Sequence, residues 1–156
     1  MIKSFYKIYS HCLGRTVYLC TLPYSKHPKG CPKHGTKSCS IKLNQIEDIL
    51  NTNKMMFLIM VSFKIDDYAK IMRFYHPNLS INQSRNLRYW QPVHRKLLRE
   101  EIKKFKKENP SSIIIDNPEN YGVDITETVK KATGIKLNWK YPLNKVWRVA
   151  IAGEQR

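Results

Sequence analysis

The fold of this chain is centred on the run MMFLIMVSF at residues 55–63, which is its most apolar window. A continuous apolar run of this length, bounded by polar residues, predicts a strand that is buried on both faces at the centre of a sheet. The run has about half the length that a membrane-spanning helix needs. The sequence therefore predicts a globular protein that does not contact a membrane.

On both sides of this run, apolar side chains recur at helical or strand spacing. The spacing predicts helices over 65–75, 80–108 and 124–134, strands over 112–115 and 146–152, a short helix or turn over 41–50, and a strand or an arm over 1–10. In the helix over 65–75, the apolar stripe expected to face the core is Ile65, Tyr68, Ile71, Met72 and Tyr75. In the strand over 146–152, Trp147, Val149 and Ile151 are expected to face inward, and the outward set is Val146, Arg148, Ala150 and Ala152. Strands and helices thus alternate after residue 54. This alternation predicts the α/β class, with α+β as the alternative, and a small sheet of about three strands with packed helices. We expect the α/β domain to span 55–156 and to form one compact unit with a cysteine-rich, metal-binding segment at 1–54.

The predicted helix over 80–108 combines a start signal with two stripes of side chains. Ser80 and Gln83 match a capping box, and Pro92 either kinks the helix or lies near the start of a second one. An apolar stripe is expected to face the core: Leu87, Trp90, Val93, Leu97, Leu98, Ile102 and Phe105. A basic ridge lies on the opposite side: Arg88, Arg95, Arg99, Lys103 and Lys106.

This basic ridge has two interpretations. It is either a solvated helix face, with Glu100, Glu101 and Glu108 supplying local ion pairs, or a surface that binds nucleic acid or an acidic protein partner. The formal net charge of +16, from 28 Lys and Arg against 12 Asp and Glu, implies attraction to anions of either kind. The oligomeric state has no signal in the sequence.

All four cysteines of the chain lie in the segment 1–54, at Cys12, Cys20, Cys31 and Cys39. This stretch is rich in Pro and Gly and lacks regularly spaced apolar residues, so we expect a metal centre rather than a core to fold it. Structural zinc sites usually contain close cysteine pairs, and these cysteines form none. Four dispersed thiolates, with a proline after Cys31, favour a [4Fe-4S] cluster, with Zn²⁺ as the alternative.

Three histidines of the same stretch, His11, His27 and His34, are alternative ligands or partners that hydrogen-bond to the ligands. Two disulfides or four free thiols would also account for the cysteines. The first ten residues contain Lys3 and Lys7 and no long apolar run, so the sequence predicts no signal peptide and a cytoplasmic location. Such a reducing compartment favours a metal over disulfides.

Two segments resemble a family of uncharacterised, predicted metal-binding proteins that have a cysteine-rich signature. The first runs from Cys20-Thr-Leu-Pro-Tyr24 through His27-Pro-Lys-Gly-Cys-Pro-Lys-His-Gly35 to Cys39, and the second is Pro118-Glu-Asn-Tyr-Gly-Val-Asp-Ile-Thr-Glu-Thr128, closing at Gly134. The resemblance implies metal binding through the cysteines and implies no particular activity. Here Ser40 follows Cys39, where members of the family often have prolines.

Two functions therefore remain open from the sequence. The first is an accessory or electron-transfer protein that holds an iron–sulfur cluster. The second is a basic nucleic-acid-binding module with a structural zinc or cluster site. An enzyme is the less favoured class, because no side-chain spacing matches a nucleophile or an acid–base pair. The two acidic residues Asp66 and Asp67 are better explained as favouring the start of a helix.

Overall fold

A computed structural model of the chain describes residues 4–15, 32, 45–138 and 144–156. Its elements, with η marking 3₁₀ helices, are β1 Phe5–Ile8, η1 Ser10–Cys12, β2 Gly14–Arg15, η3 Ile46–Asp48, β3 Met56–Lys64, α2 Ile65–Tyr75, α3 Ile81–Ser84, α4 Leu87–Glu108, β4 Ile113–Ile115, η4 Pro118–Tyr121, β5 Val123–Asp124, α5 Ile125–Thr133 and β6 Lys145–Gly153. Among these described residues, no helix has both the length and the apolar character needed to cross a bilayer.

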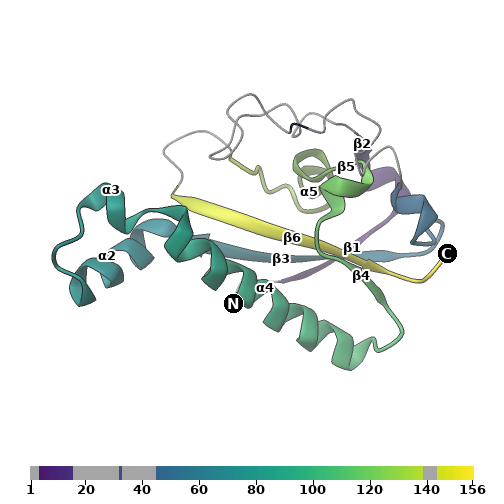
Figure 1. The fold of residues 1–156 in the computed structure, drawn as a ribbon. Coiled ribbons are helices and arrows are strands. Elements are labelled where there is room, and N and C mark those ends of the chain that lie inside the picture. The colour runs from purple at the N-terminus through teal and green to yellow at the C-terminus, as the bar shows by residue number, and fades with distance from the viewer. Residues whose placement is uncertain (1–3, 16–31, 33–44, 139–143) are drawn as a thin grey trace.

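The main sheet has four strands in the order β1-β3-β6-β4, and every neighbouring pair is antiparallel (Figure 1). The apolar run at 55–63 forms β3, which lies inside the sheet as predicted. The mixed α/β class is confirmed, and the sheet contains one strand more than the three expected after residue 54, because Phe5–Ile8 pairs with β3. A second, two-stranded sheet joins β2 to β5.

Helices cover both faces of the main sheet (Figure 1). On one face, Leu98 and Phe105 of α4 pack on Ile59, Ala150 and Ala152. On the other face, α5, η1 and η3 pack on the strands, in a cluster that contains these residues among others: Ile8, Cys12, Ile46, Met60, Val129 and Ile151. Because both faces are covered, β3 and β6 carry apolar residues at consecutive positions rather than at alternate ones.

Several helix boundaries follow from local signals in the sequence. The helix α2 spans 65–75 as predicted, with Asp66 and Asp67 in its first turn. The helix α5 begins directly after Asp124, whose side chain accepts a hydrogen bond of 3.1 Å from the backbone N–H of Glu127. It ends at Gly134, which has the positive φ of 79° that glycine adopts without strain.

The capping box at Ser80 is formed, but it caps the four-residue helix α3 rather than the long helix. The long helix α4 begins after Asn86, whose side chain accepts a hydrogen bond of 2.9 Å from the N–H of Arg88. The predicted span 80–108 therefore contains two helices, but the break lies at residues 85–86 rather than at Pro92, which is inside α4.

The predicted burial is wrong for several apolar residues. In α4, Val93 and Leu97 are 36% and 37% exposed, because the helix rests on the sheet through a narrow strip that includes the polar His94 instead. In α2, Ile71 and Tyr75 were expected to face the core, yet they are exposed, as is Phe74. In β6 the error is the reverse, since Ala150 and Ala152 were expected to face outward and are fully buried beneath α4. The remaining residues of the predicted α4 stripe do face the sheet.

His94 is a buried histidine on this strip of α4. Its Nε2–H donates a hydrogen bond of 2.9 Å to the carbonyl oxygen of Val61 in β3, and its ring stacks on Phe63. Burial, together with the positive charge of Arg148, lowers the pKa of His94 to about 4, although the hydrogen bond to Val61 acts in the opposite direction. The ring is therefore neutral in the folded protein at neutral pH.

A first prediction tests which residues of α4 form the core. Phe105 is 2% exposed and contacts the rings of Phe5 and Phe57, at centroid distances of 5.4 Å and 5.1 Å. We expect Phe105→Ala to lower the free energy of unfolding by about 3–5 kcal/mol, since it leaves a cavity. The matched variant Leu97→Ala on the same helix should cost less than about 1 kcal/mol. Urea unfolding measures both, and equal losses would contradict the assignment.

A second prediction concerns the pH dependence of stability. Because the folded-state pKa of His94 lies below its unfolded value of 6.5, the unfolded chain binds a proton that the folded chain does not. Stability should therefore fall as the pH drops from 6.5 toward 4, by up to about 1.4 kcal/mol per pH unit. Urea midpoints between pH 7 and pH 4.5 should fall less steeply for His94→Gln. The exposed His76→Gln should keep the wild-type slope, and parallel profiles for all three proteins would refute the assignment.

Candidate nucleic-acid interface

The five basic residues of the predicted ridge, Arg88, Arg95, Arg99, Lys103 and Lys106, are all exposed in α4. The buried residues of this helix lie on a different strip, which packs on the sheet: Trp90, His94, Leu98 and Phe105. A helix repeats its faces every three or four residues, so the ridge positions share one side. The structure therefore confirms that the ridge is exposed on one side of α4, with a gap of about two turns between Arg88 and Arg95.

Within the described part of the chain, no ridge residue forms an ion pair. The acidic residue Glu101 pairs instead with Lys104, at 3.0 Å, and Lys104 does not belong to the ridge. Among the residues that the structure describes, Arg95 makes a long side-chain contact of 3.5 Å with Gln91. Local acidic partners thus leave the charge of the ridge largely uncompensated.

A further arginine lies close to the ridge. Arg148 belongs to β6 and shares a strand face with Ala150 and Ala152, which α4 covers. Burial lowers the pKa of Arg148, and repulsion from Arg95 lowers it further. Two guanidinium groups are therefore held close enough to repel each other, an arrangement that a bound anion would relieve.

Two acidic groups, Glu119 of η4 and Asp116, act against this repulsion at Arg148. Burial raises the pKa of Glu119, whereas the charge of Arg148 lowers it by a smaller amount. Its Oε2 atom is buried and has no hydrogen-bond partner among the described residues. Burial therefore favours the neutral carboxyl, and Arg148 favours the charged one.

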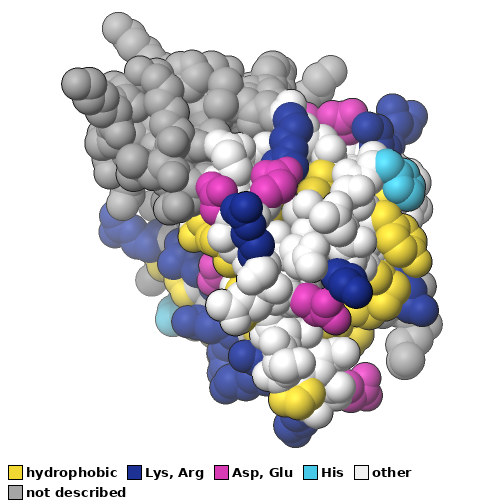
Figure 2. Space-filling model, turned by 90° about the vertical axis from the view of Figure 1, so that its right-hand side faces the viewer, with side chains coloured by type: hydrophobic (Ala, Val, Ile, Leu, Met, Phe, Trp, Pro, Cys, Tyr) yellow, Lys and Arg dark blue, Asp and Glu magenta, His cyan; other side chains and the backbone are white. Residues whose placement is uncertain are grey.

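A shallow hollow of about 410 Å³ lies between α4 and β4. Its lining comes from one face of α4 and from the edge strand: Arg99, Ile102, Lys106, Ser112, Ile113, Ile114 and Asp116. Two of the five ridge cations thus border a concave surface, where their fields add. The space-filling view in Figure 2 shows a different surface, the end of the molecule near the C-terminus, where acidic and basic side chains are interspersed among polar and hydrophobic ones.

The predicted metal ligands fall mostly outside the described residues. This applies to Cys20, Cys31, Cys39, His27 and His34. Cys12 lies in η1, forms no disulfide bond with a described residue, and is 7% exposed within the apolar cluster under α5. His11 is exposed and stacks on Tyr9, with ring centroids 6.0 Å apart. Among the described residues, no group of three or more candidate ligands forms a metal site.

Arg148 and Glu119 were not identified from the sequence. The signal for Arg148 was the strand pattern itself, since Val146, Ala150 and Ala152 share its face and are apolar. That face was expected to point to solvent, where an arginine is ordinary, so the pattern did not single out Arg148. Glu119 lies in a short turn that has no periodic pattern, and the sequence contains no signal for its burial.

No protein-family model, no curated protein and no solved structure matches this chain. The resemblance of its cysteine segment to predicted metal-binding proteins therefore stays a prediction. What the basic ridge can bind must therefore be inferred from its charges, its exposure and its neighbouring residues.

Proposed function

We propose that this chain binds nucleic acid through the ridge on α4. The observation that carries the proposal is that five cations lie on one exposed strip with no ion pair among the described residues. From Arg88 to Lys106 the strip extends roughly 27 Å, at about 1.5 Å per residue. This length matches several successive phosphates of a nucleic acid backbone.

The proposed contacts are to phosphates rather than to bases. Arginine and lysine neutralise phosphates without reading sequence, whereas readout needs side chains placed on base edges. Arg148 adds a further positive charge near Arg95, although Glu119 and Asp116 act on it in the opposite direction, and this charge favours an anion beside the ridge. The proposal therefore implies affinity without strong sequence preference.

A third prediction concerns the salt dependence of binding. Replacing Arg88, Arg95 and Arg99 together with glutamine should weaken binding to a labelled oligonucleotide and flatten the plot of log affinity against log salt. The slope should fall by about 0.7 to 0.9 for each phosphate contact that is lost. Fluorescence anisotropy at several salt concentrations measures both quantities.

The matched control removes the same charge from other exposed positions of α4. Lys96→Gln, Lys104→Gln and Lys107→Gln lie on the same helix, outside the ridge. If nucleic acid binds along the ridge, this control should keep most of the wild-type slope. Equal slopes for the two triple variants would mean that only net charge matters, and would remove the ridge from the proposal.

We also propose a metal centre held by Cys12, Cys20, Cys31 and Cys39, most simply a [4Fe-4S] cluster, with Zn²⁺ as the alternative. The specific observation in its favour is the grouping of all four cysteines of the chain within 28 residues. An accessory or electron-transfer role would follow from a cluster, and a structural role within the nucleic-acid-binding module would follow from zinc. The proposal assigns the protein to the cytoplasm, where thiols stay reduced.

A fourth prediction tests the metal centre. Anaerobically purified protein should contain bound iron and show a visible thiolate-to-iron absorption that dithionite bleaches. Replacing Cys20, Cys31 and Cys39 with serine should abolish the metal content measured by elemental analysis, whereas His11→Gln should retain it. Stoichiometric zinc without colour would select the alternative metal, and protein without metal would refute the centre.

A further inference from the structure

The strand β4 forms one edge of the main sheet. It pairs with β6 through Ile113, Ile114 and Ile115, and no other described strand pairs with it. On the outer side of such a strand, alternate backbone N–H and C=O groups point away from the sheet. These groups can pair with the backbone of a further strand.

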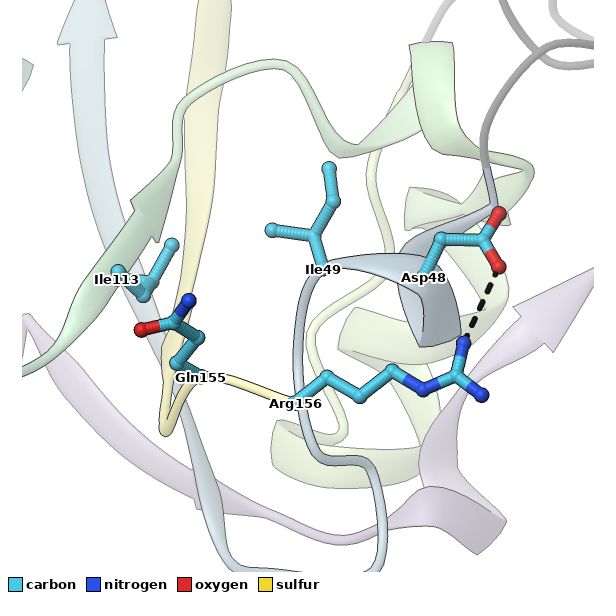
Figure 3. Close-up of a pocket in the computed structure, with 5 residues that line it drawn as sticks. All are labelled: Asp48, Ile49, Ile113, Gln155 and Arg156. Carbon is cyan, nitrogen blue, oxygen red and sulfur yellow. Dashed lines mark hydrogen bonds and ion pairs between the residues drawn. The ribbon is translucent and has the colours of Figure 1, made fainter.

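Hollows lie on both faces of the sheet beside this edge. The hollow toward α4 contains Ile114, which packs with the α4 cluster. A second hollow, of about 450 Å³, lies on the opposite face and is shown in Figure 3. It is lined by the following residues: Asp48, Ile49, Ile113, Gln155 and Arg156.

Ile113 borders both hollows, so they flank the same edge strand. Successive side chains of a strand point to opposite faces. A strand added along β4 would therefore direct its side chains alternately into the two hollows. The hollows would select side chains, while the backbone of β4 would supply hydrogen bonds.

The chemistry of the hollows differs between the two faces. The hollow toward α4 is lined by two cations, Arg99 and Lys106, neither of which is ion-paired within the described part of the chain, and by a single carboxylate, Asp116, so its net charge is positive. In the other hollow, Arg156 is already paired with Asp48, at 3.5 Å, beside the aliphatic side chain of Ile49. The first hollow thus favours acidic side chains, and the second favours aliphatic ones.

We infer that β4 is the docking edge for an extended, acidic peptide segment of a partner protein, with acidic and aliphatic residues at alternate positions. A second copy of this chain fits the site poorly, because its net charge of +16 would repel the first copy. The inference goes beyond nucleic-acid binding. The two ligands would compete for Arg99 and Lys106, which belong to both surfaces.

A fifth prediction tests the inferred backbone pairing with a labelled eight-residue peptide of alternating Glu and Val. We expect saturable binding by fluorescence anisotropy. Two N-methylated forms, with methyl groups on the Glu residues or on the Val residues, block opposite edges of the peptide. One form should lose at least tenfold in affinity, while the other should bind like the parent peptide. Equal affinities for the two forms, or no binding of the parent, would overturn the inference.

Variants of the full chain test where the peptide docks. Arg99→Glu with Lys106→Glu should weaken peptide binding at least tenfold. The matched pair Lys96→Glu and Lys103→Glu, which lie on α4 outside the hollow, should change it less than threefold. Equal losses in both pairs would indicate general charge attraction and overturn the site. Oligonucleotide binding by the variant that replaces Arg88, Arg95 and Arg99 is measured separately. Either proposal can therefore fail while the other holds.

Discussion

The structure depends on the antiparallel pairing of β3 with β6, which runs from Phe57 opposite Ala152 to Lys64 opposite Lys145. Both strands lie inside the sheet and are apolar on both faces. Both faces of the sheet must therefore be covered, because burying apolar surface stabilises the fold by roughly 25 cal/mol per Å² of area removed from water. The helix α4 covers one face, and α5 with η1 and η3 covers the other. The chain is thus layered around one pair of strands.

This constraint also determines which surface of α4 is available for binding. On the face toward α4, β6 offers the small residues Ala150 and Ala152, on which Phe105 packs. A narrow strip of the helix is then enough to cover the sheet, and most of its circumference remains exposed. The buried strip fixes the rotation of the helix about its axis. This rotation determines that the cations of the ridge, including those beside β4, are exposed.

Features that have a local cause were predictable from the sequence. The strand β3 follows from a run of apolar residues, the ends of α5 follow from its capping residues Asp124 and Gly134, and the exposure of the ridge follows from helical spacing. Other features depend on contacts between distant segments. Whether Val93 or His94 faces the sheet is decided by how α4 rests on β3, because His94 finds a carbonyl partner in Val61. Similarly, the outward assignment of Ala150 failed because the covering helix comes from a distant part of the chain.

The helix α2 presents Ile71, Phe74 and Tyr75 to solvent, and in Figure 1 it lies with α3 at one extremity of the molecule. In dilute buffer the charge of +16 opposes the approach of a second copy to these side chains. At about 1 M salt the Debye length shrinks to about 3 Å and this repulsion is lost. Ionic strength should therefore set the tendency of the protein to self-associate through this helix, and the high salt that would weaken binding to a polyanion would also screen the repulsion between copies.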